Sequence, residues 1–133
     1  MLMPHHVFCY GSLMYPSVWR RVVRGRYDQQ RVTVHGYQRY ALRHASYPGL
    51  RSAPEAKVEG VLYLDIRRDD VRRLDAFEGN EYEQITVACI TSDGVAHEAF
   101  AYLYRARYAH RVLGDVWDAA AFETHHLPCF LTR

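Results

Sequence analysis

The segment from Tyr82 to Tyr104 predicts a pair of antiparallel strands. Apolar and polar side chains alternate on both sides of a central turn, Ser92-Asp93-Gly94. An alternation with a period of two places the apolar side chains on one face of a sheet, and a short turn containing Asp and Gly joins the strands as a hairpin. The apolar positions of the first strand are Ile85, Val87 and Cys89. This hairpin is the clearest element of the sequence, and it favours a sheet with antiparallel neighbours.

Three other segments predict extended chain: His5–Tyr10, Arg31–Leu42 and Val58–Leu64. Gly36 interrupts the second of them, so we expect that strand to bend there, because glycine inside a strand accompanies bulges and bends. The intervening segment, Arg43–Pro54, contains a Pro-Gly pair and a further proline. These residues favour turns, so the sequence predicts a loop at this place.

A helix is predicted to begin at Asp69 or Asp70 and to end at Gly79. Either aspartate is a suitable N-terminal cap, and glycine accepts the positive φ found just after many helices. Its apolar side chains recur in steps of three, at Val71, Leu74 and Phe77. A shorter helix of one or two turns is predicted for Pro16–Val23, which has proline in its first turn.

The tail, Gly114–Arg133, predicts one more helix, which Pro128 is expected to break. Strands therefore outnumber helices, and the two kinds of element do not alternate along the chain. This order indicates an α+β fold with a mixed or antiparallel sheet, curled into a small β-barrel. The length of 133 residues fits a single domain, 1–133.

Composition and charge exclude several classes of protein. Hydrophobic residues make up 49% of the chain and charged residues 24%, which indicates neither disorder nor a membrane span. The formal net charge is only +2, and arginines are scattered over Arg20–Arg26, Arg67–Arg73 and Arg105–Arg111, so no nucleic-acid partner is expected. Met1–His6 shows no features of a signal peptide, so we expect a cytoplasmic protein.

The cysteines and histidines do not predict a metal site or a disulfide framework. Cys9, Cys89 and Cys129 are odd in number and lack metal-type spacing, so buried thiols are the simpler interpretation. A zinc site would have to combine His5-His6 and His125-His126 with Cys129. Adjacent histidines on a strand point to opposite faces, so this ligand set is not expected, and we expect no metal and no cofactor.

A turn that can bind an anion follows the first predicted strand, at Tyr10-Gly11-Ser12-Leu13. Glycine lets the backbone approach a ligand closely, and neighbouring N–H groups can then surround a carboxylate. The same four residues are more often an ordinary structural turn. The tetrapeptide alone therefore does not predict an anion site.

Glu78 occupies the last turn of the predicted helix that Gly79 ends. The negative end of the helix dipole and the apolar neighbours Leu74 and Phe77 both disfavour ionisation, so we expect a raised pKa. A carboxyl whose pKa is raised toward neutrality is suited to general acid/base catalysis. A glutamate in front of a glycine is, however, more often a solvated surface residue.

Three motifs stand far apart in the sequence: Tyr10-Gly11-Ser12-Leu13-Met14, then Leu74-Asp75-Ala76-Phe77-Glu78-Gly79 followed by Tyr82, and finally Ala101-Tyr102-Leu103-Tyr104. Their order and spacing resemble the gamma-glutamylcyclotransferase-like family, in its small plant and bacterial branch. The resemblance extends through the Tyr47-Pro48-Gly49 segment and the aromatic tail with Trp117, Phe122, His126 and Phe130. Agreement among several separated motifs is more specific than any single one.

The resemblance implies a small β-barrel with flanking helices, whose mouth binds a small-molecule gamma-glutamyl substrate. In the family, main-chain N–H groups of the glycine loop hold the substrate's α-carboxylate, which here corresponds to Tyr10, Gly11, Ser12 and Leu13. Glu78 matches the catalytic glutamate. The implied reaction is attack by the substrate's α-amine on its own γ-carbonyl, which releases an amine and leaves 5-oxoproline.

Further site candidates and one departure accompany the resemblance. Tyr82 and Tyr104 are candidates for substrate binding, with core aromatics as the alternative interpretation. The family often has a basic residue where this chain has Gln84, and its glycine loop differs from that of the glutathione-specific branch, so glutathione is not the favoured substrate. Glu81 and Glu83 are expected to face solvent.

A binding module that keeps the barrel and the anion-binding turn without turnover is the alternative function, because fold alone does not establish activity. We expect neither nucleic acid nor membrane as a partner. The sequence fixes neither the amine of the substrate nor the oligomeric state.

Overall fold

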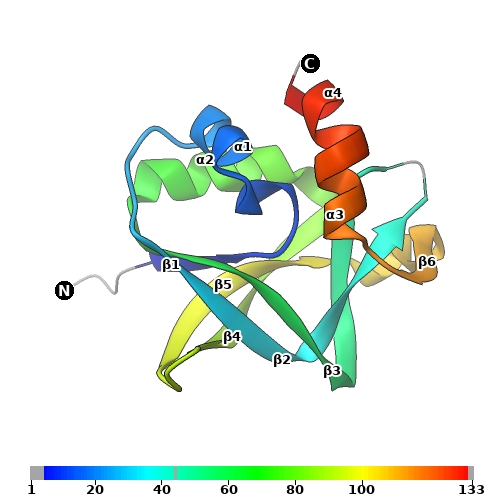
Figure 1. Cartoon of the computed structure of the whole chain (residues 1–133), viewed down its shortest axis with the longest axis horizontal. Helices are drawn as coiled ribbons and strands as arrows, with labels where there is room; N and C mark the ends of the chain where they lie inside the picture. Colours follow the sequence, from blue (N-terminus) through cyan, green and yellow to red (C-terminus); the bar gives the residue numbers. More distant parts are fainter. Residues whose placement is uncertain (1–4, 44, 132–133) are drawn as a thin grey trace.

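The computed structural model describes residues 5–43 and 45–131, and its strands form one sheet. Helices gather over one end of this sheet, and the turn between β4 and β5 lies at the opposite end (Figure 1). The strands are β1 (His5–Cys9), β2 (Gln29–Leu42), β3 (Pro48–Ile66), β4 (Tyr82–Thr91), β5 (Ala96–Tyr104) and β6 (Val112–Val116). The end of the predicted helix Gly114–Arg133, residues 132–133, lies outside the described residues, as do residues 1–4.

The sheet closes into a five-stranded barrel. β1 pairs antiparallel with β3 and parallel with β5, while β3 pairs with β2, β2 with β4, and β4 with β5, all antiparallel. The short β6 extends the sheet by pairing with the end of β2. The mixed barrel predicted from the sequence is thus confirmed. The predicted hairpin is confirmed as well, with Tyr82 opposite Tyr104.

The loop predicted for Arg43–Pro54 is largely wrong, because β3 begins at Pro48 and forms a long hairpin with β2. Proline is tolerated as the first residue of a strand, where no ladder hydrogen bond needs its N–H. Gly49 is required by packing, since a Cβ there would lie 2.9 Å from Cβ of Tyr104. The predicted bend at Gly36 is confirmed by its φ of 88° and a shift in register beside it.

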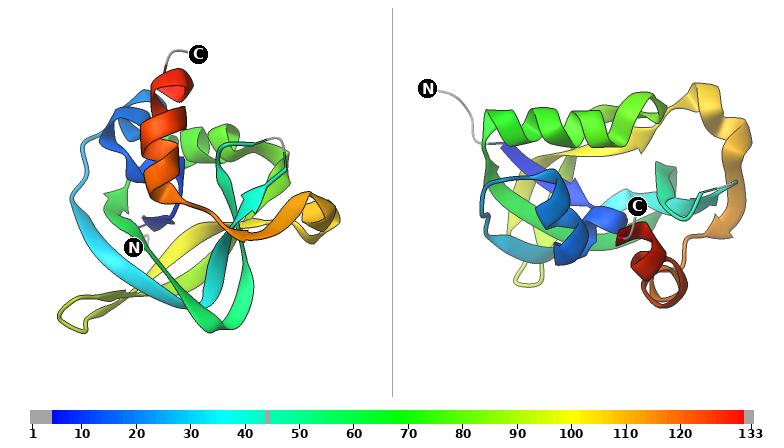
Figure 2. Two further views of the ribbon diagram at one scale, coloured as in Figure 1. Left: turned by 45° about the vertical axis from the view of Figure 1, so that its right-hand side comes forward. Right: turned by 90° about the horizontal axis from the view of Figure 1, so that it is seen from above.

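The helices cover one end of the barrel (Figure 2). Helix α1 (Pro16–Val22) contacts α2 (Arg68–Glu78), and the C-terminal helix packs beside the start of α1. In that last contact the Tyr15 hydroxyl donates to the carbonyl of Ala119, and the ring of Tyr15 lies 5.4 Å from that of Phe122. Along these described residues no helix is long and apolar enough to cross a membrane. The expected cytoplasmic location stays a prediction.

The C-terminal segment differs from the single broken helix that was predicted. Its first residues form β6, and the helical part consists of α3 (Ala119–Ala121), a π-helical turn (Phe122–His126) and α4 (Leu127–Leu131). Pro128 lies inside this helix without breaking it. The N–H of Leu127 donates to the carbonyl of Phe122, five residues earlier, so the hydrogen-bond register has already widened where proline cannot donate.

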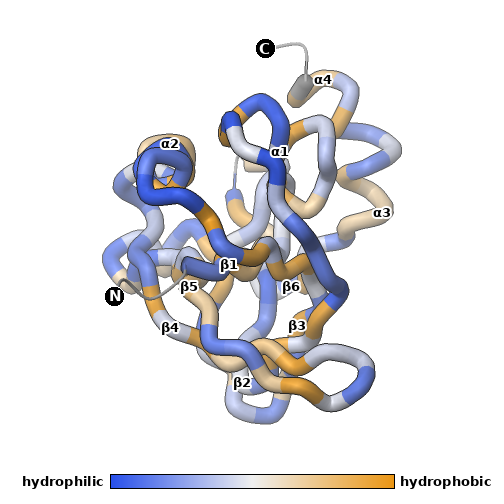
Figure 3. The backbone as a smooth tube through the Cα atoms, turned by 90° about the vertical axis from the view of Figure 1, so that its left-hand side faces the viewer, coloured by the Kyte–Doolittle hydropathy of each residue, from blue (hydrophilic) through white to orange (hydrophobic). Residues whose placement is uncertain are grey.

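Two apolar cores follow from the alternation along the strands. Phe8 of β1 and Tyr10, which comes just after β1, face the barrel interior, whereas Val7 and Cys9 face the helices. Hydrophobic stretches alternate with hydrophilic ones along the chain (Figure 3). Cys9 and Cys89 are buried, as expected, but Cys129 is exposed on α4.

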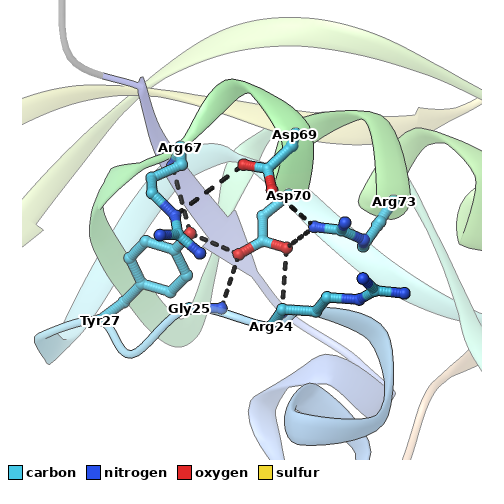
Figure 4. A network of polar contacts seen from close by, with 7 residues as sticks. All are labelled: Arg24, Gly25, Tyr27, Arg67, Asp69, Asp70 and Arg73. Carbon is cyan, nitrogen blue, oxygen red and sulfur yellow. Dashed lines mark hydrogen bonds and ion pairs between the residues drawn. The ribbon is translucent and has the colours of Figure 1, made fainter.

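Asp70 joins the start of α2 to the segment that follows α1 (Figure 4). It was predicted as a possible cap, but the residue that precedes the helix is Arg67, and the fully buried Asp70 carboxylate binds another segment. It accepts hydrogen bonds from the backbone N–H groups of Arg24 and Gly25, both at 2.9 Å, and from the Tyr27 hydroxyl at 2.5 Å. Arg73 donates to it at 2.6 Å.

These donors decide the charge state of Asp70. Burial alone would raise its pKa, but the hydrogen bonds from Tyr27, from the two backbone N–H groups and from Arg73 outweigh burial and hold the pKa below its ordinary value. A carboxyl whose pKa is lower in the folded than in the unfolded state stabilises the fold above its unfolded pKa. That stabilisation is lost as the pH falls through the folded pKa.

We therefore expect Asp70→Asn to lower the free energy of unfolding by about 2–4 kcal/mol at pH 7, since two backbone donors and Arg73 lose a charged acceptor. The difference from wild type should narrow as the pH falls below about 4. Urea unfolding at several pH values measures both effects. The exposed neighbour provides the control, Asp69→Asn, which should have a much smaller effect; equal losses in the two variants would contradict this assignment.

Candidate active site

A cavity of about 280 Å³ opens at the helix-covered end of the barrel. We call it the main cavity. It is lined by the turn after β1, by the end of α2 and by the start of β3, three segments that are distant in the sequence. Of the predicted site residues, the structure brings together Tyr10, Gly11, Ser12, Leu13, Glu78 and Tyr82.

The turn after β1 lines the main cavity with Gly11, Ser12 and Leu13. Ser12–Met14 forms a 3₁₀ turn, in which the N–H of Met14 donates to the carbonyl of Gly11 at 3.0 Å. The N–H groups of Ser12 and Leu13 come first in this turn, so they have no acceptor within it. Gly11 is needed for packing, because a Cβ there would lie 2.8 Å from Cδ of Pro48. The turn can therefore accept an anion.

Glu78 is the last residue of α2 and faces the main cavity. Gly79 follows with a φ of 74°, a left-handed conformation that ends the helix there. Among the described residues, no donor forms a hydrogen bond with the Glu78 carboxyl, which leaves its oxygens to a ligand. Burial, and then the negative charge of Glu81, raise the pKa of Glu78 to about 8. The carboxyl is thus poised to exchange a proton near neutral pH.

The tyrosine hydroxyls around the main cavity already donate their protons. Tyr10 donates to the carbonyl of Tyr102 at 2.6 Å, and Tyr82 donates to the carbonyl of Pro48 at 2.7 Å. Tyr102, which also lines the cavity, donates to Asp75 at 2.6 Å. Because a tyrosine hydroxyl has a single proton, these groups hold the walls in place and can only accept from a ligand.

Glu81 lies on the wall of the main cavity instead of facing solvent, which corrects the expectation for this residue. The 3₁₀ turn Gly79–Glu81 reverses the chain after α2 and brings the side chain back. Glu81 accepts hydrogen bonds from the hydroxyls of Tyr104 at 3.0 Å and Tyr47 at 3.4 Å, and Arg111 lies 3.7 Å away. These contacts hold the Glu81 side chain in place on the cavity wall. The exposed Glu83 fits its expectation.

Tyr104 does not line the main cavity, although its ring contacts that of Tyr82 at 5.3 Å. It lines a second cavity of about 380 Å³, which shares only Tyr47 and Glu81 with the main cavity. Burial, and then its hydrogen bond to Glu81, raise the pKa of the Tyr104 hydroxyl to about 12. It therefore remains a protonated donor to Glu81.

Other chemistries find less support around the main cavity. Cys9 lines it, but burial, and then the charge of Glu78, raise the pKa of its thiol, so the nucleophilic thiolate is disfavoured. Over residues 5–43 and 45–131, no three His, Cys, Asp or Glu side chains are grouped so that they could hold a metal ion.

Sequence reasoning missed Glu81 and Tyr102 as cavity residues. The signal for Tyr102 was present, because it alternates with Tyr104 along β5. Glu81 had no such signal, since only the turn after α2 redirects it. Gln84, where the family often has a basic residue, donates to Asp75 at 2.6 Å, so a neutral amide here supports the carboxylate that also binds Tyr102.

Comparisons with known proteins agree with this architecture. Protein AIG2 C of Arabidopsis thaliana is 29% identical over 128 residues, which cover 96% of this chain and 77% of that protein. AIG2-like protein A of the same plant is 34% identical over 89 residues, 67% of this chain and 54% of its own length.

Solved structures show the same fold. A solution structure of an Arabidopsis thaliana protein has a TM-score of 0.77 at 27% identity, covering 98% of this chain and 88% of that one. A structure named gamma-glutamyl cyclotransferase has a TM-score of 0.69 at 16% identity, covering 77% and 68% of the two chains. At that identity the likeness concerns the fold alone. The model of the gamma-glutamyl cyclotransferase, AIG2-like family matches residues 7–119, most of the sequence, and the chain therefore belongs to this family.

Proposed function

We propose that this protein is a gamma-glutamylcyclotransferase, which closes the gamma-glutamyl group of an amide substrate into 5-oxoproline and releases the amine. One observation carries the proposal: Glu78, with a pKa near 8, lines the same small cavity as the anion-binding turn of Ser12 and Leu13. A gamma-glutamyl group brings an α-carboxylate for the turn and an α-ammonium for Glu78.

Substrate positioning provides most of the rate enhancement in this reaction, because the nucleophile and the electrophile belong to one molecule. When the N–H groups of Ser12 and Leu13 hold the α-carboxylate, the γ-carbonyl has to fold back toward the α-nitrogen to fit the cavity. Holding reacting groups in a near-attack geometry supplies a large part of a rate enhancement. No nucleophilic side chain is needed.

Glu78 moves the protons. As a carboxylate it accepts a proton from the α-ammonium, and the freed nitrogen attacks the γ-carbon to close a five-membered ring. The C–N bond to the leaving group then breaks as Glu78 returns the proton to the departing nitrogen. The ring nitrogen still carries one proton too many, which Glu78 takes up and passes to the released amine, so that the products are 5-oxoproline, whose ring amide is neutral, and an ammonium. Substrate atoms and protons balance without water or another reactant.

The oxyanion that forms at the γ-carbonyl is assigned to a backbone N–H of the turn other than those of Ser12 and Leu13, which hold the α-carboxylate. The Tyr104 hydroxyl is not free for this role, because it already donates to Glu81. Preorganised backbone donors stabilise such an oxyanion without having to reorient during the reaction. Tyr10 and Tyr82 shape the main cavity, and their hydroxyls donate to backbone carbonyls.

Substitution of Glu78 by glutamine should abolish turnover and preserve binding. Glutamine keeps the size of the side chain but cannot exchange the proton, so we expect kcat to fall by a factor of roughly 10² to 10⁴. The measurement is 5-oxoproline release from a panel of gamma-glutamyl amides, with calorimetric binding of 5-oxoproline as the test for an intact cavity. Undiminished turnover in Glu78→Gln would refute the proposed role, whereas binding without turnover in wild type would establish the binding module instead.

The pH profile should depend on Glu81. The active form of Glu78 is the carboxylate, so kcat/KM should rise with pH until it passes the pKa near 8. The charge of Glu81 raises that pKa, so Glu81→Gln should move the rising limb to lower pH. The matched control is Glu83→Gln, because this exposed glutamate does not line the cavity; the same displacement in both variants would count against a specific effect of Glu81.

A further inference from the structure

The second cavity shares Tyr47 and Glu81 with the main cavity, and two arginines, Arg43 and Arg111, lie on its walls together with His110 and Tyr104. No part of the reaction described above uses these arginines. Because the two cavities share a wall, one ligand can occupy both at once.

The strand pairing places the two arginines together. Leu42 at the end of β2 pairs with Val112 at the start of β6, and the N–H of Arg43 donates to the carbonyl of Arg111 at 2.7 Å. The guanidinium of Arg111 stacks on the ring of Tyr108 at 4.7 Å from its centre. Residues almost seventy positions apart in the sequence therefore meet in one backbone ladder, and a stacked arginine is more rigid than a solvated one.

The cavity keeps a positive charge after its internal contacts are counted. Glu81 neutralises Arg111 in part, at 3.7 Å, and its oxygens are also occupied by the hydroxyls of Tyr47 and Tyr104. Arg43 forms no ion pair with any described residue. A ligand group in this cavity is therefore attracted if it is anionic, and carboxylates are matched by the planar donors of arginine.

The boundary between the two cavities is thin. Tyr47 and Glu81 line both, and the hydroxyl of Tyr47 meets Glu81 at 3.4 Å, a long hydrogen bond. A chain of a few atoms that leaves the γ-carbonyl beside Glu78 can therefore reach the second cavity along this wall.

We propose that the second cavity is the subsite for the leaving amine, and that Arg43 and Arg111 select leaving amines that carry a carboxylate. This assignment rests on the proposed cyclotransferase function. The reaction is unchanged: the α-nitrogen bonds to the γ-carbon, the bond from that carbon to the leaving nitrogen breaks, and the proton passes through Glu78 to that nitrogen. The carboxylate stays on the departing amine and takes no part in bond breaking.

A pair of substrates that differ only by the carboxylate tests this subsite. Gamma-glutamyl-alanine and gamma-glutamyl-ethylamide have the same leaving nitrogen and the same carbon attached to it. We expect wild type to favour the alanine substrate in kcat/KM by about tenfold, as a charge-assisted hydrogen bond predicts. The preference should shrink as salt is added, because the arginines are partly exposed.

Variants of Arg43 assign the preference to the cavity. In Arg43→Gln the ratio of kcat/KM for the alanine substrate to kcat/KM for the ethylamide should fall toward one. In Arg43→Glu, gamma-glutamyl-1,4-diaminobutane, whose leaving amine carries a second ammonium, should become a better substrate than gamma-glutamyl-alanine. The matched control is Arg107→Gln, since Arg107 is an exposed arginine of the neighbouring 3₁₀ segment that does not line the cavity. This control should keep the wild-type ratio.

The experiment separates a wrong subsite from a wrong function. If wild type turns over both substrates equally, or if Arg107→Gln changes the ratio as much as Arg43→Gln, the subsite assignment is overturned and the cyclotransferase stands. If wild type turns over neither of these nor any other gamma-glutamyl amide, the proposed function falls and the subsite falls with it.

Discussion

The position of β1 is the constraint on which the rest of the structure depends. This short strand pairs antiparallel with β3 on one edge and parallel with β5 on the other, and so closes the barrel. Because both edges are fixed, the chain leaves β1 at a determined point: Tyr10 enters the barrel interior and Gly11 packs against Pro48. Helix α2 covers the same end through the fully buried Leu74, which brings Glu78 opposite the turn.

Two carboxyls only three residues apart have opposite environments, and the turn at Gly79 is the reason. Glu81 accepts hydrogen bonds from two tyrosine hydroxyls and lies 3.7 Å from Arg111. Glu78 is half-buried in the cavity wall without a donor among the described residues, and burial raises its pKa to about 8. A carboxyl whose pKa is raised toward neutrality is suited to acid/base chemistry. One turn of chain thus separates a carboxyl with several partners from one that has no hydrogen-bond donor in the described part of the chain.

Local patterns in the sequence predicted the hairpin, the end of α2 at Gly79 and the placement of Glu78, because each depends on alternation or on glycine geometry. The segment around Pro48 was wrongly predicted as a loop, because proline and glycine are typical of turns. In the structure, close packing against Tyr104 requires Gly49, and this contact between distant segments cannot be predicted from a local pattern. Asp70 was predicted as a possible helix cap, because aspartate is common at that position. Its actual partners are backbone N–H groups that follow α1, and local propensity cannot reveal them. The family resemblance predicted the turn after β1 and Glu78 as site residues, but not Glu81.

The raised pKa of Glu78 means that its carboxyl differs in protonation between the empty and the occupied cavity. At pH 7 a carboxyl with a pKa near 8 is mostly protonated, and thus cannot accept a proton. A substrate ammonium placed beside it favours the carboxylate, since an opposite charge within about 4–6 Å lowers such a pKa. In the proposed reaction the substrate therefore brings both the proton to be moved and the charge that ionises its acceptor. On this proposal the half-buried carboxyl stands in the empty cavity as the neutral acid, and it becomes a base only when a substrate is bound.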